Sequence, residues 1–494
     1  MSRLQLTEEQ QKIVDAEFDS ILLINAYAGT GKTSTLVEFV RSPKRKCKKF
    51  LYLSYNSSMS KSAAKSFKGI KNVVIKTIHS LAYGAVGHKY KERLGNLRVL
   101  DMLGYCEDVD EKEQYYYAYL LLSLVREFAN SKYTMEKFIN IKIEESSSWG
   151  KEHKASLRYF LDKLPSVWED LLTNEEMPFE HDFYLKLYQL SEPKLYFDYI
   201  LVDEAQDING VIIDIVLKQR SKKVFIGDTY QQIYSWRGAS NSLEILSKMP
   251  GTKTLYLTQS FRCPQVVAAL ANQYLTLLDA PKPFRGTRIQ RNDDPTQTTV
   301  VARTNAKLFD YVVENILFNE DEEEFKIHFV GGIKSYNFQD LIDIQNLQWG
   351  KTEYIRNGFL KRFYDIEELS EYAEEANEVD LKVKITIVRK YMKHNIRNLI
   401  KMIEERVVDA NKADYLLTTG HKSKGLEWDN VLILDDFVNI KEEIREDGEA
   451  VVSKEELNLL YVAITRSKHK LSISKDYILS NEFIEENRHL IRIM

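Results

Sequence analysis

Short runs of β-branched and aromatic residues alternate with longer helical patterns along most of this chain. Each run ends in a polar or glycine-containing turn, which is typical of the β-α-β units that build a buried parallel sheet. The sequence therefore predicts an α/β fold with two sets of strands. The first set comprises residues 20–25, 49–55, 72–77, 197–203 and 222–227, and the second comprises residues 253–257, 298–302, 326–330, 414–419, 430–434 and 470–474.

Two stretches with helical spacing and no strand pattern interrupt these sets, at residues 96–190 and 341–405. Because 494 residues exceed the usual size of one domain, we interpret the stretches as helical insertions into two α/β domains. The predicted limits are 1–95 with 191–250 for domain 1A, 96–190 for its insertion 1B, 251–340 with 406–494 for domain 2A, and 341–405 for its reduced insertion 2B.

A glycine-containing loop at residues 26–33 joins the first strand to a helical pattern. Glycines let backbone N–H groups turn toward phosphate oxygens, and a helix N-terminus adds a positive dipole. In such a loop Lys32 reaches the β- and γ-phosphates and Thr33 supplies a magnesium ligand. The strict pattern has glycine where Ala26 stands, so a glycine-rich turn without a ligand is the alternative. The predicted contacts to the nucleotide phosphates are Ala28, Gly29, Thr30, Gly31, Lys32 and Thr33.

Two adjacent carboxylates, Asp203 and Glu204, follow the apolar run at residues 197–203. Open α/β sheets bind their ligands at the carboxyl ends of their strands. Asp203 is therefore predicted to hold magnesium, and Glu204 to orient or deprotonate the attacking water. An acidic pair after a strand is common and by itself is weak evidence for a site. Its occurrence together with the phosphate loop favours a functional role.

The composition excludes several classes of protein. The net charge of -4 predicts that any contact with nucleic acid depends on a local groove. The cationic run at residues 44–49 is predicted to be a solvated loop. Cys47, Cys106 and Cys263 lack the spacing of a zinc site, and no disulfide is expected. With no membrane-length apolar run and no secretory signal, we expect an intracellular protein, cytoplasmic or nucleoid-associated, without a membrane partner.

A polar loop at residues 227–238 carries two aromatic residues, Tyr234 and Trp236, two positions apart. In an extended backbone both rings face the same side. Such a pair is suited to stacking on successive bases, at about 1 to 3 kcal/mol per base. The alternative is that both rings fill the core.

Further polar clusters lie later in the chain, at residues 260–262, 419–428 and 461–467. Two of them contain the arginines Arg262 and Arg466. An arginine from a facing domain can stabilise the charge on a transferring phosphoryl group. Ordinary surface or ion-pair roles are the alternative for each arginine.

Taken in order, these segments resemble the motif series of superfamily-one helicases of the UvrD/Rep type. Residues 6–10 resemble the adenine-reading segment of that family, residues 77–80 its single-strand-contact motif, and residues 301–305 its later strand motif. The resemblance runs from about residue 6 to residue 475.

A closer resemblance is to the helicase part of the F-box DNA helicases. Residues 177–186, 257–262 and 327–333 carry it. We see no F-box, so a ubiquitin-ligase role is not expected. The insertion at residues 341–405 is shorter than in the UvrD/Rep enzymes.

The resemblance implies roles for individual residues. Those implied to touch the nucleotide are Gln10 at the adenine, Phe261 stacking near it, Gln231 sensing the γ-phosphate, Glu427 at the sugar, and Arg262 with Arg466 as arginine fingers. Those implied to lie near the DNA strand are Thr77, His79, Tyr234, Trp236, Arg237 and His421.

We therefore expect two RecA-like parallel-sheet motor domains, each with a helical insertion, using ATP and Mg²⁺ to move 3′-to-5′ on single-stranded DNA. Partial duplex DNA is the second expected partner, and an unidentified protein partner is left open. One alternative is a translocase that strips proteins from single strands. Another is an ATP-switched adaptor that binds DNA and regulates a partner nuclease or recombination factor.

Overall fold

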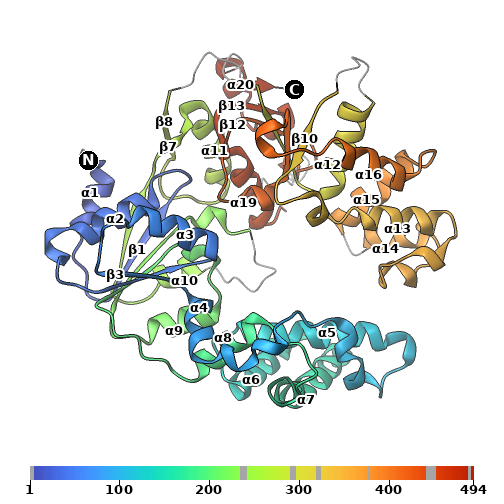
Figure 1. The fold of residues 1–494 in the computed structure, drawn as a ribbon, viewed down its shortest axis with the longest axis horizontal. Helices are drawn as coiled ribbons and strands as arrows, with labels where there is room; N and C mark the ends of the chain where they lie inside the picture. Colours follow the sequence, from blue (N-terminus) through green and yellow to red (C-terminus); the bar gives the residue numbers. More distant parts are fainter. Residues whose placement is uncertain are drawn as a thin grey trace. The chain divides into compact units, whose positions relative to one another are not determined.

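The computed structural model describes residues 5–233, 242–289, 296–318, 324–375, 378–440, 452–487 and 491–493. The chain divides into two compact units, Met1–Tyr27 with Gly31–Leu257, and Ala28–Thr30 with Thr258–Met494. Each unit contains a six-stranded parallel sheet with helices packed around it (Figure 1). The predicted α/β fold with two parallel-sheet domains is confirmed, whereas the residue limits of the four domains stay predictions.

The sheet of the first unit has the strand order β3-β2-β4-β5-β1-β6, and every pairing in it is parallel. Its strands are β1 (Ile21–Ala26), β2 (Phe50–Ser54), β3 (Val73–Thr77), β4 (Tyr199–Val202), β5 (Lys222–Gly227) and β6 (Thr252–Leu257). The strands β1 and β4 therefore flank β5, so the segments that follow these three strands meet at one edge of the sheet.

The last strand of this sheet corrects the sequence analysis. Residues 253–257 were grouped with the second set of strands, and that assignment is wrong. β6 pairs in parallel with β1, from Ile21 opposite Thr252 to Ala26 opposite Leu257. The physical reason is that an apolar run specifies a strand but not the strand beside which it lies.

The helices of the first unit fall into two groups. Those next to the sheet are α1 (Glu8–Val14), α2 (Lys32–Arg41), α3 (Ser57–Ser66), α4 (Ile78–Ala85), α9 (Gly210–Leu217) and α10 (Ser242–Ser247). Those of the helical insertion are α5 (Glu111–Asn130), α6 (Met135–Glu145), α7 (Lys151–Thr173) and α8 (His181–Leu190). None of the helices in the described residues is both long enough and apolar enough to cross a membrane.

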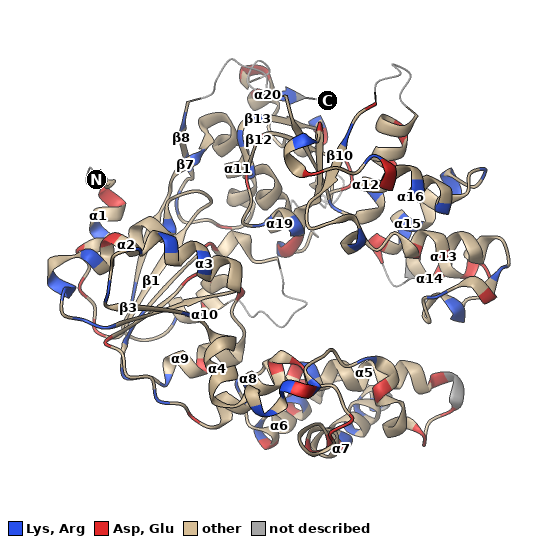
Figure 2. Ribbon diagram, in the orientation of Figure 1, with Lys and Arg blue, Asp and Glu red and all other residues tan. Residues whose placement is uncertain are grey.

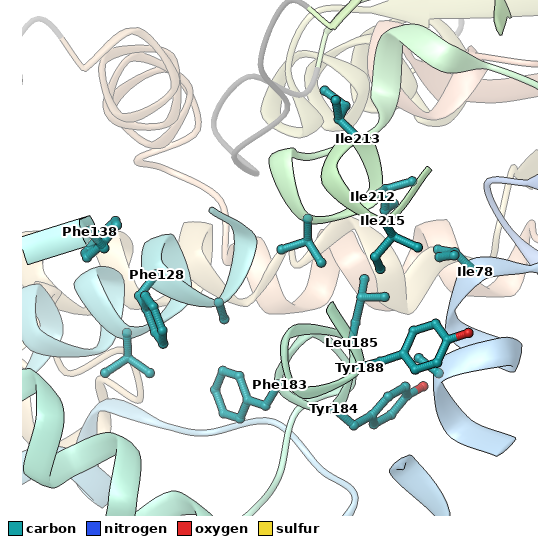
Figure 3. Close-up of a cluster of buried hydrophobic side chains, with 14 of the residues drawn as sticks. Ile78, Phe128, Phe138, Phe183, Tyr184, Leu185, Tyr188, Ile212, Ile213 and Ile215 are labelled. Carbon is teal, nitrogen blue, oxygen red and sulfur yellow. The ribbon is translucent and has the colours of Figure 1, made fainter. Parts of the chain in front are cut away.

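The helical insertion shares one apolar core with one face of the sheet. The cluster contains Leu51 of β2 and Ile200 of β4 together with Phe128 of α5 and Phe183 of α8. Figure 3 shows Phe128 and Phe183 in this cluster with Ile212 of α9. Burying such side chains contributes about 1.5 to 3 kcal/mol each. The insertion is therefore a continuation of the first unit's core and not a separately folded appendage.

Lys186 of α8 is a fully buried lysine within this insertion. Its ammonium group donates hydrogen bonds to the carbonyls of Ser131, at 2.7 Å, and Tyr133, at 2.5 Å, and lies 4.6 Å from the centre of the Phe128 ring. Burial lowers the pKa of Lys186 to about 7, although the charge of Asp214 acts to raise it.

The cationic run at residues 44–49, predicted to be solvated, contains a buried member. Arg45 is 3% exposed and donates hydrogen bonds of 2.6 Å to the carbonyls of Val14 and Ala16. Its guanidinium lies 3.7 Å from the centre of the Phe39 ring. Arg45 therefore connects the end of α1 to α2. In Figure 2 the segment that follows α2 carries Lys and Arg residues, drawn in blue. The prediction was wrong for Arg45 because the pattern does not show which carbonyls lie beside it.

The second unit has the strand order β10-β11-β9-β12-β13-β14. Its strands are β9 (Thr298–Ala302), β10 (Ile327–Phe329), β11 (Tyr415–Thr419), β12 (Trp428–Ile433), β13 (Ser467–Ile473) and β14 (Arg492–Ile493), and a small parallel sheet pairs β7 (Gln259–Pro264) with β8 (Arg285–Arg288). The helices are α11 (Gln265–Leu277), α12 (Asn305–Val312), α13 (Gln339–Gln348), α14 (Ile366–Glu375), α15 (Val379–Lys390), α16 (Ile396–Glu405), α17 (Gly420–Ser423), α19 (Lys454–Ile464) and α20 (Asn481–Asn487). The stretch of α13 to α16 confirms the second helical insertion.

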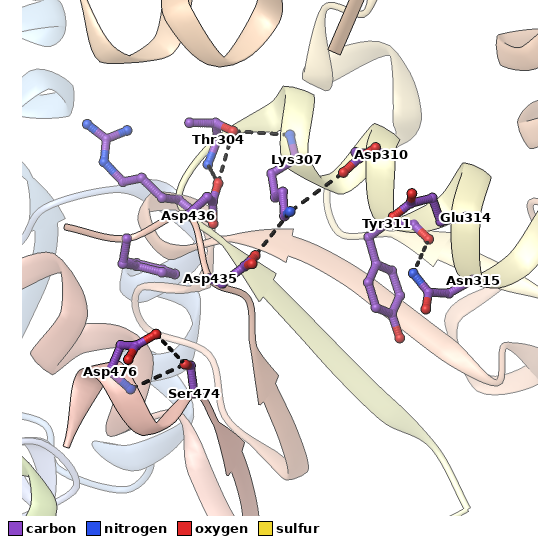
Figure 4. Close-up of polar contacts among 12 residues, drawn as sticks. Thr304, Lys307, Asp310, Tyr311, Glu314, Asn315, Asp435, Asp436, Ser474 and Asp476 are labelled. Atoms are coloured by element: carbon purple, nitrogen blue, oxygen red, sulfur yellow. Dashed lines mark hydrogen bonds and ion pairs between the residues drawn. The ribbon is translucent and has the colours of Figure 1, made fainter. Parts of the chain in front are cut away.

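A partly buried carboxylate joins two strand ends in this unit (Figure 4). Asp436, just after β12, accepts hydrogen bonds of 2.8 Å from the backbone N–H groups of Arg303 and Thr304, which follow β9. Lys307 adds an ion pair with Asp435 at 3.0 Å. These contacts fix the predicted motif at residues 301–305 against the end of the neighbouring strand.

We predict that Lys186 gives the folding stability a specific dependence on pH. The unfolded chain binds one more proton than the folded chain between pH about 7 and about 10.5, so stability rises with pH in that window. The contribution amounts to at most about 1.4 kcal/mol per pH unit. This pH dependence is measured from the unfolding free energies of wild type and Lys186→Met at several pH values from about 7.5 to about 9.5.

The unfolding free energy of Lys186→Met is expected to rise less steeply with pH than that of wild type. This expectation holds whether the variant is more or less stable than wild type at any one pH. Lys61→Met removes an exposed lysine of α3 and is the matched control. Equal slopes for wild type and Lys186→Met would contradict the prediction.

Candidate active site

The loop after β1 has the backbone that the sequence predicted. Gly29 and Gly31 adopt positive φ angles of 69° and 79°, which glycine tolerates without steric cost. Ala26 is instead the last residue of β1, fully buried and paired with Leu257 of β6. The departure from the strict glycine pattern therefore falls within a strand, where an alanine side chain is accommodated.

Helix α2 begins at Lys32, directly after the loop. Gly31 is its N-cap and offers no side chain to the first turn. The free N–H groups and the dipole of a helix N-terminus favour an anion. The loop and the helix together thus form the kind of backbone cradle that binds phosphate.

Lys32 forms an ion pair with the predicted water-activating residue. Its ammonium nitrogen lies 2.8 Å from Oε2 of Glu204, and both side chains are largely buried. Burial acts to lower the pKa of Lys32, but the charges of Glu204, Asp203 and Asp228 outweigh it and raise that pKa. Lys32 is therefore a fixed cation among three carboxylates.

Asp203 and Glu204 occupy the turn after β4. Asp203 is 4% exposed, and its Oδ1 accepts the backbone N–H of Glu204 at 2.9 Å. Burial, with the nearby charge of Glu204, raises the pKa of Asp203. Glu204 has a φ of 50° in the left-handed region, which costs a residue with a side chain about 1 to 2 kcal/mol. Such strain is expected where a side chain is held for chemistry.

Gln206 connects Glu204 to the end of β5. Its amide nitrogen donates to Oε2 of Glu204 at 2.7 Å, and its amide oxygen accepts the backbone N–H of Asp228 at 3.1 Å. A Cβ on Gly227 would lie 2.3 Å from that oxygen, so glycine is required there. Asp228 in turn accepts a hydrogen bond of 2.7 Å from the side-chain amide of Gln231, the predicted γ-phosphate sensor. Sequence reasoning assigned no role to Gln206, although it stands two residues after Glu204.

His79 lies on α4, and its Nε2 is 3.1 Å from Oδ1 of Asp182 on α8. Thr77 caps the same helix by accepting the N–H of Ser80 at 3.1 Å. A pocket of about 290 Å³ is lined by His79 and Asp182 and also by Asp203. The structure thus brings a predicted DNA-contacting residue and the predicted metal ligand to the wall of one pocket in the first unit.

The tip of the loop, Ala28–Thr30, groups with the second unit. The hydroxyl of Ser260 donates to the carbonyl of Ala28 at 2.8 Å, and the N–H of Phe261 donates to the carbonyl of Gly29 at 2.9 Å. The side chain of Phe261 is 47% exposed. The predicted stacking residue therefore adjoins the tip of the loop, Ala28–Thr30, which belongs to the same unit.

The two predicted arginine fingers have protein partners in the second unit. Arg262 donates from Nε to Oε2 of Glu427 at 2.6 Å. Arg466 is fully buried and donates to the carbonyls of Val462, at 2.7 Å, and Leu426, at 3.0 Å. A finger role would require each arginine to exchange these partners for phosphate, so the assignments stay predictions. The contact of Glu427 with the nucleotide sugar also stays a prediction.

Comparisons with known proteins identify the family. Residues 6–249 match the family described as the UvrD/REP helicase N-terminal domain. F-box DNA helicase 1 of Gallus gallus is 32% identical over 100% of this chain and 51% of its own length. F-box DNA helicase protein 1 of Schizosaccharomyces pombe is 29% identical over 96% of this chain and 58% of its own length. Residues 6–249 therefore match the UvrD/REP helicase N-terminal domain, and the chain as a whole is similar to the F-box DNA helicases.

The resemblance to this family, including the F-box DNA helicases, is confirmed. A further relative is the putative ATP-dependent DNA helicase YjcD of Bacillus subtilis, which is 24% identical over 95% of this chain and 78% of its own length. The chain spans 51% and 58% of the two F-box DNA helicases. What those proteins do as wholes is therefore not transferred to this chain by similarity alone.

The donors present after β4 suit a magnesium ion bound together with nucleotide phosphates. Among the described residues there is no cluster of three or more His, Cys, Asp or Glu side chains that could hold a metal unaided. Magnesium is commonly held by one or two carboxylates and by substrate phosphates, with water completing the shell. The buried Asp203, beside a second carboxylate with Lys32 as the paired cation, has the charge that such an ion would balance.

Other predicted residues of the UvrD/Rep motifs are only partly placed. Gln10 is 2% exposed, and its side-chain oxygen accepts the N–H of Thr7 at 3.1 Å in a helix-capping arrangement. His421 lies in α17, which Thr419 caps. Tyr234, Trp236 and Arg237 lie outside the described residues, so their contacts with DNA stay predictions.

We predict that Glu204→Gln lowers ATP turnover by about 10²- to 10⁴-fold, because an amide cannot accept the proton of the attacking water. Nucleotide binding is expected to persist, since Lys32 and the loop are intact. Lys32→Ala is expected to lose both binding and turnover. Steady-state hydrolysis and fluorescent-nucleotide binding measure the two effects.

Lys61→Ala and Glu38→Gln change an exposed lysine of α3 and a carboxylate of α2 that pairs with Arg41. Both controls are expected to behave as wild type. Near-normal turnover in either site variant would show that the hydrolytic site lies elsewhere.

Proposed function

We propose that this chain is an ATP-dependent DNA helicase or translocase that moves 3′-to-5′ on single-stranded DNA. The observation that carries the proposal is the buried Lys32–Glu204 ion pair of 2.8 Å, which joins a phosphate-type loop to a strained acidic turn within the residues that match the UvrD/REP helicase N-terminal domain. The names of the relatives, DNA helicases in each case, support DNA as the substrate.

The geometry suggests how hydrolysis begins. The triphosphate oxygens draw the ammonium of Lys32 away from Glu204, because the phosphates carry the larger negative charge. Glu204 then keeps its bond from Gln206 and accepts a proton from the attacking water. A magnesium ion, held by Asp203 and Thr33 beside the phosphates, would supply charge neutralisation on the transferring group.

The same residues offer a route from hydrolysis to the predicted DNA loop. When Glu204 exchanges Lys32 for water, the bond from Gln206 transmits the change to Asp228 and onward to Gln231. Gln231 precedes the predicted stacking residue Trp236 by five positions. One short segment thus links the nucleotide to the predicted DNA contact, which favours a motor over a passive ATP switch.

The pocket beside Asp203 supports DNA contact in the first unit. His79 on its wall is held by Asp182 of the helical insertion at 3.1 Å. Burial acts to raise the pKa of Asp182, but the hydrogen bond from His79 outweighs it and lowers that pKa. The carboxylate therefore stays charged and holds the His79 ring at the wall of the pocket.

The decisive experiment varies the length of single-stranded DNA. A motor binds at random and travels to one end, so its ATPase rate rises with strand length before it reaches a plateau. The alternative, an adaptor that regulates a nuclease or recombination factor, gives a rate set by occupancy alone. A rate independent of length at saturating DNA would reject the motor.

The direction of travel is tested with partial duplexes that carry a 3′ or a 5′ single-stranded tail. We expect unwinding from the 3′ tail, as the resemblance implies. Glu204→Gln is the control that binds DNA without travelling. Preferential unwinding from the 5′ tail would reverse the proposed polarity.

Trp236→Ala is predicted to weaken single-strand affinity by roughly 5- to 150-fold, because it removes a stacking surface worth about 1 to 3 kcal/mol. ATPase without DNA is expected to persist, and unwinding to fall further than ATPase at saturating DNA. Filter binding, hydrolysis and unwinding assays measure these effects. A stable variant that unwinds at the normal rate would exclude the stacking role, and a lowered melting temperature with lost basal ATPase would indicate a core residue.

A further inference from the structure

Tyr52 of β2 is a buried tyrosine to which neither the family motifs nor the sequence analysis gave a role. Its side chain is 1% exposed, and its hydroxyl donates a hydrogen bond to Oδ2 of Asp203. A phenol O–H next to a carboxylate acts as the donor, so Tyr52 holds this oxygen of Asp203.

The two oxygens of Asp203 are held by different donors. Oδ2 receives the Tyr52 hydroxyl from the neighbouring strand, whereas Oδ1 receives the N–H of Glu204 at 2.9 Å. A carboxylate offers about four lone-pair positions, so each oxygen retains one for another partner. Donors on both oxygens fix the plane of the carboxylate, which a single donor would leave free to rotate.

The second predicted magnesium ligand also lies beside Tyr52. The side chain of Thr33 is close enough to the phenol of Tyr52 to interact with it. The ring is braced by Phe67, whose centroid lies 5.2 Å away in an edge-on arrangement. One rigid phenol thus adjoins both residues that would bind the ion, Asp203 and Thr33.

We propose that Tyr52 is a positioning residue for magnesium, which orients the Asp203 carboxylate and sets the affinity of the nucleotide site for the ion. The proposal rests on the ATP and magnesium use proposed above, but not on DNA or on movement. Partners of this kind, which hold a metal ligand without touching the metal, typically change metal affinity by about 10- to 100-fold when removed.

The test is Tyr52→Phe in the full chain, read by nucleotide binding and not by turnover. A fluorescent ADP analogue is titrated at increasing Mg²⁺ concentration. We expect the Mg²⁺ midpoint to rise by about 10- to 100-fold. Affinity measured without Mg²⁺ is expected to stay unchanged, because Lys32 and the loop are untouched, and this value also shows that the variant is folded.

Tyr105→Phe is the matched control. Tyr105 makes the same kind of phenol–carboxylate bond, to Asp170 at 2.7 Å, but within the helical insertion. It is expected to leave the Mg²⁺ midpoint unchanged even if it lowers the melting temperature. An unchanged midpoint in Tyr52→Phe would overturn the proposal, as would an equal shift in the control.

A second measurement keeps the hydroxyl in place. With 3-fluorotyrosine at position 52, Mg²⁺ added to the nucleotide complex is expected to shift the ¹⁹F resonance, and an unmoved resonance would overturn the proposal. If the wild-type chain shows no Mg²⁺-dependent nucleotide binding, the proposed function fails. If wild type shows it and Tyr52→Phe does not differ, only the role of Tyr52 fails.

Discussion

The ion pair between Lys32 and Glu204 is the constraint around which the first unit is arranged. Asp203 and Glu204 are adjacent carboxylates in a largely buried turn, and like charges there are costly without a cation. Lys32 supplies that cation because β1 and β4 flank β5 in the sheet. The segments after these strands can therefore meet, and the parallel pairing brings the loop and the acidic turn to the same edge.

The space at the end of β5 completes this arrangement. Gly227 leaves room for the amide of Gln206, which bonds to Glu204 on one side and to the backbone of Asp228 on the other. The side-chain carboxylate of Glu204, carried on a backbone with a φ of 50°, is thereby held by Lys32 and by Gln206. We propose that a change of partner at Glu204 is passed along these short hydrogen bonds, because the low dielectric of a protein interior makes each bond stronger than in water.

The helical insertion takes part in the site because it has no core of its own. Apolar side chains of α5 and α8 pack into the cluster that also covers β2 and β4. This packing fixes Asp182 of α8 beside His79 of α4, and it also buries the ammonium of Lys186. Two carbonyls and an aromatic face offset only part of the cost of burying that charge, because the pKa of Lys186 is still lowered to about 7.

The sequence by itself determined the phosphate loop, the acidic pair and the alternation of strands and helices, because each depends on local backbone geometry and on the period of apolar residues. Tertiary structure decided that β6 lies beside β1, that Arg45 is buried, and that Gln206 and Tyr52 hold the acidic turn. It also gave Arg466 carbonyl partners in place of an exposed position. These features depend on which distant segments become neighbours, and a side chain's partner across a sheet leaves no periodic trace in the chain.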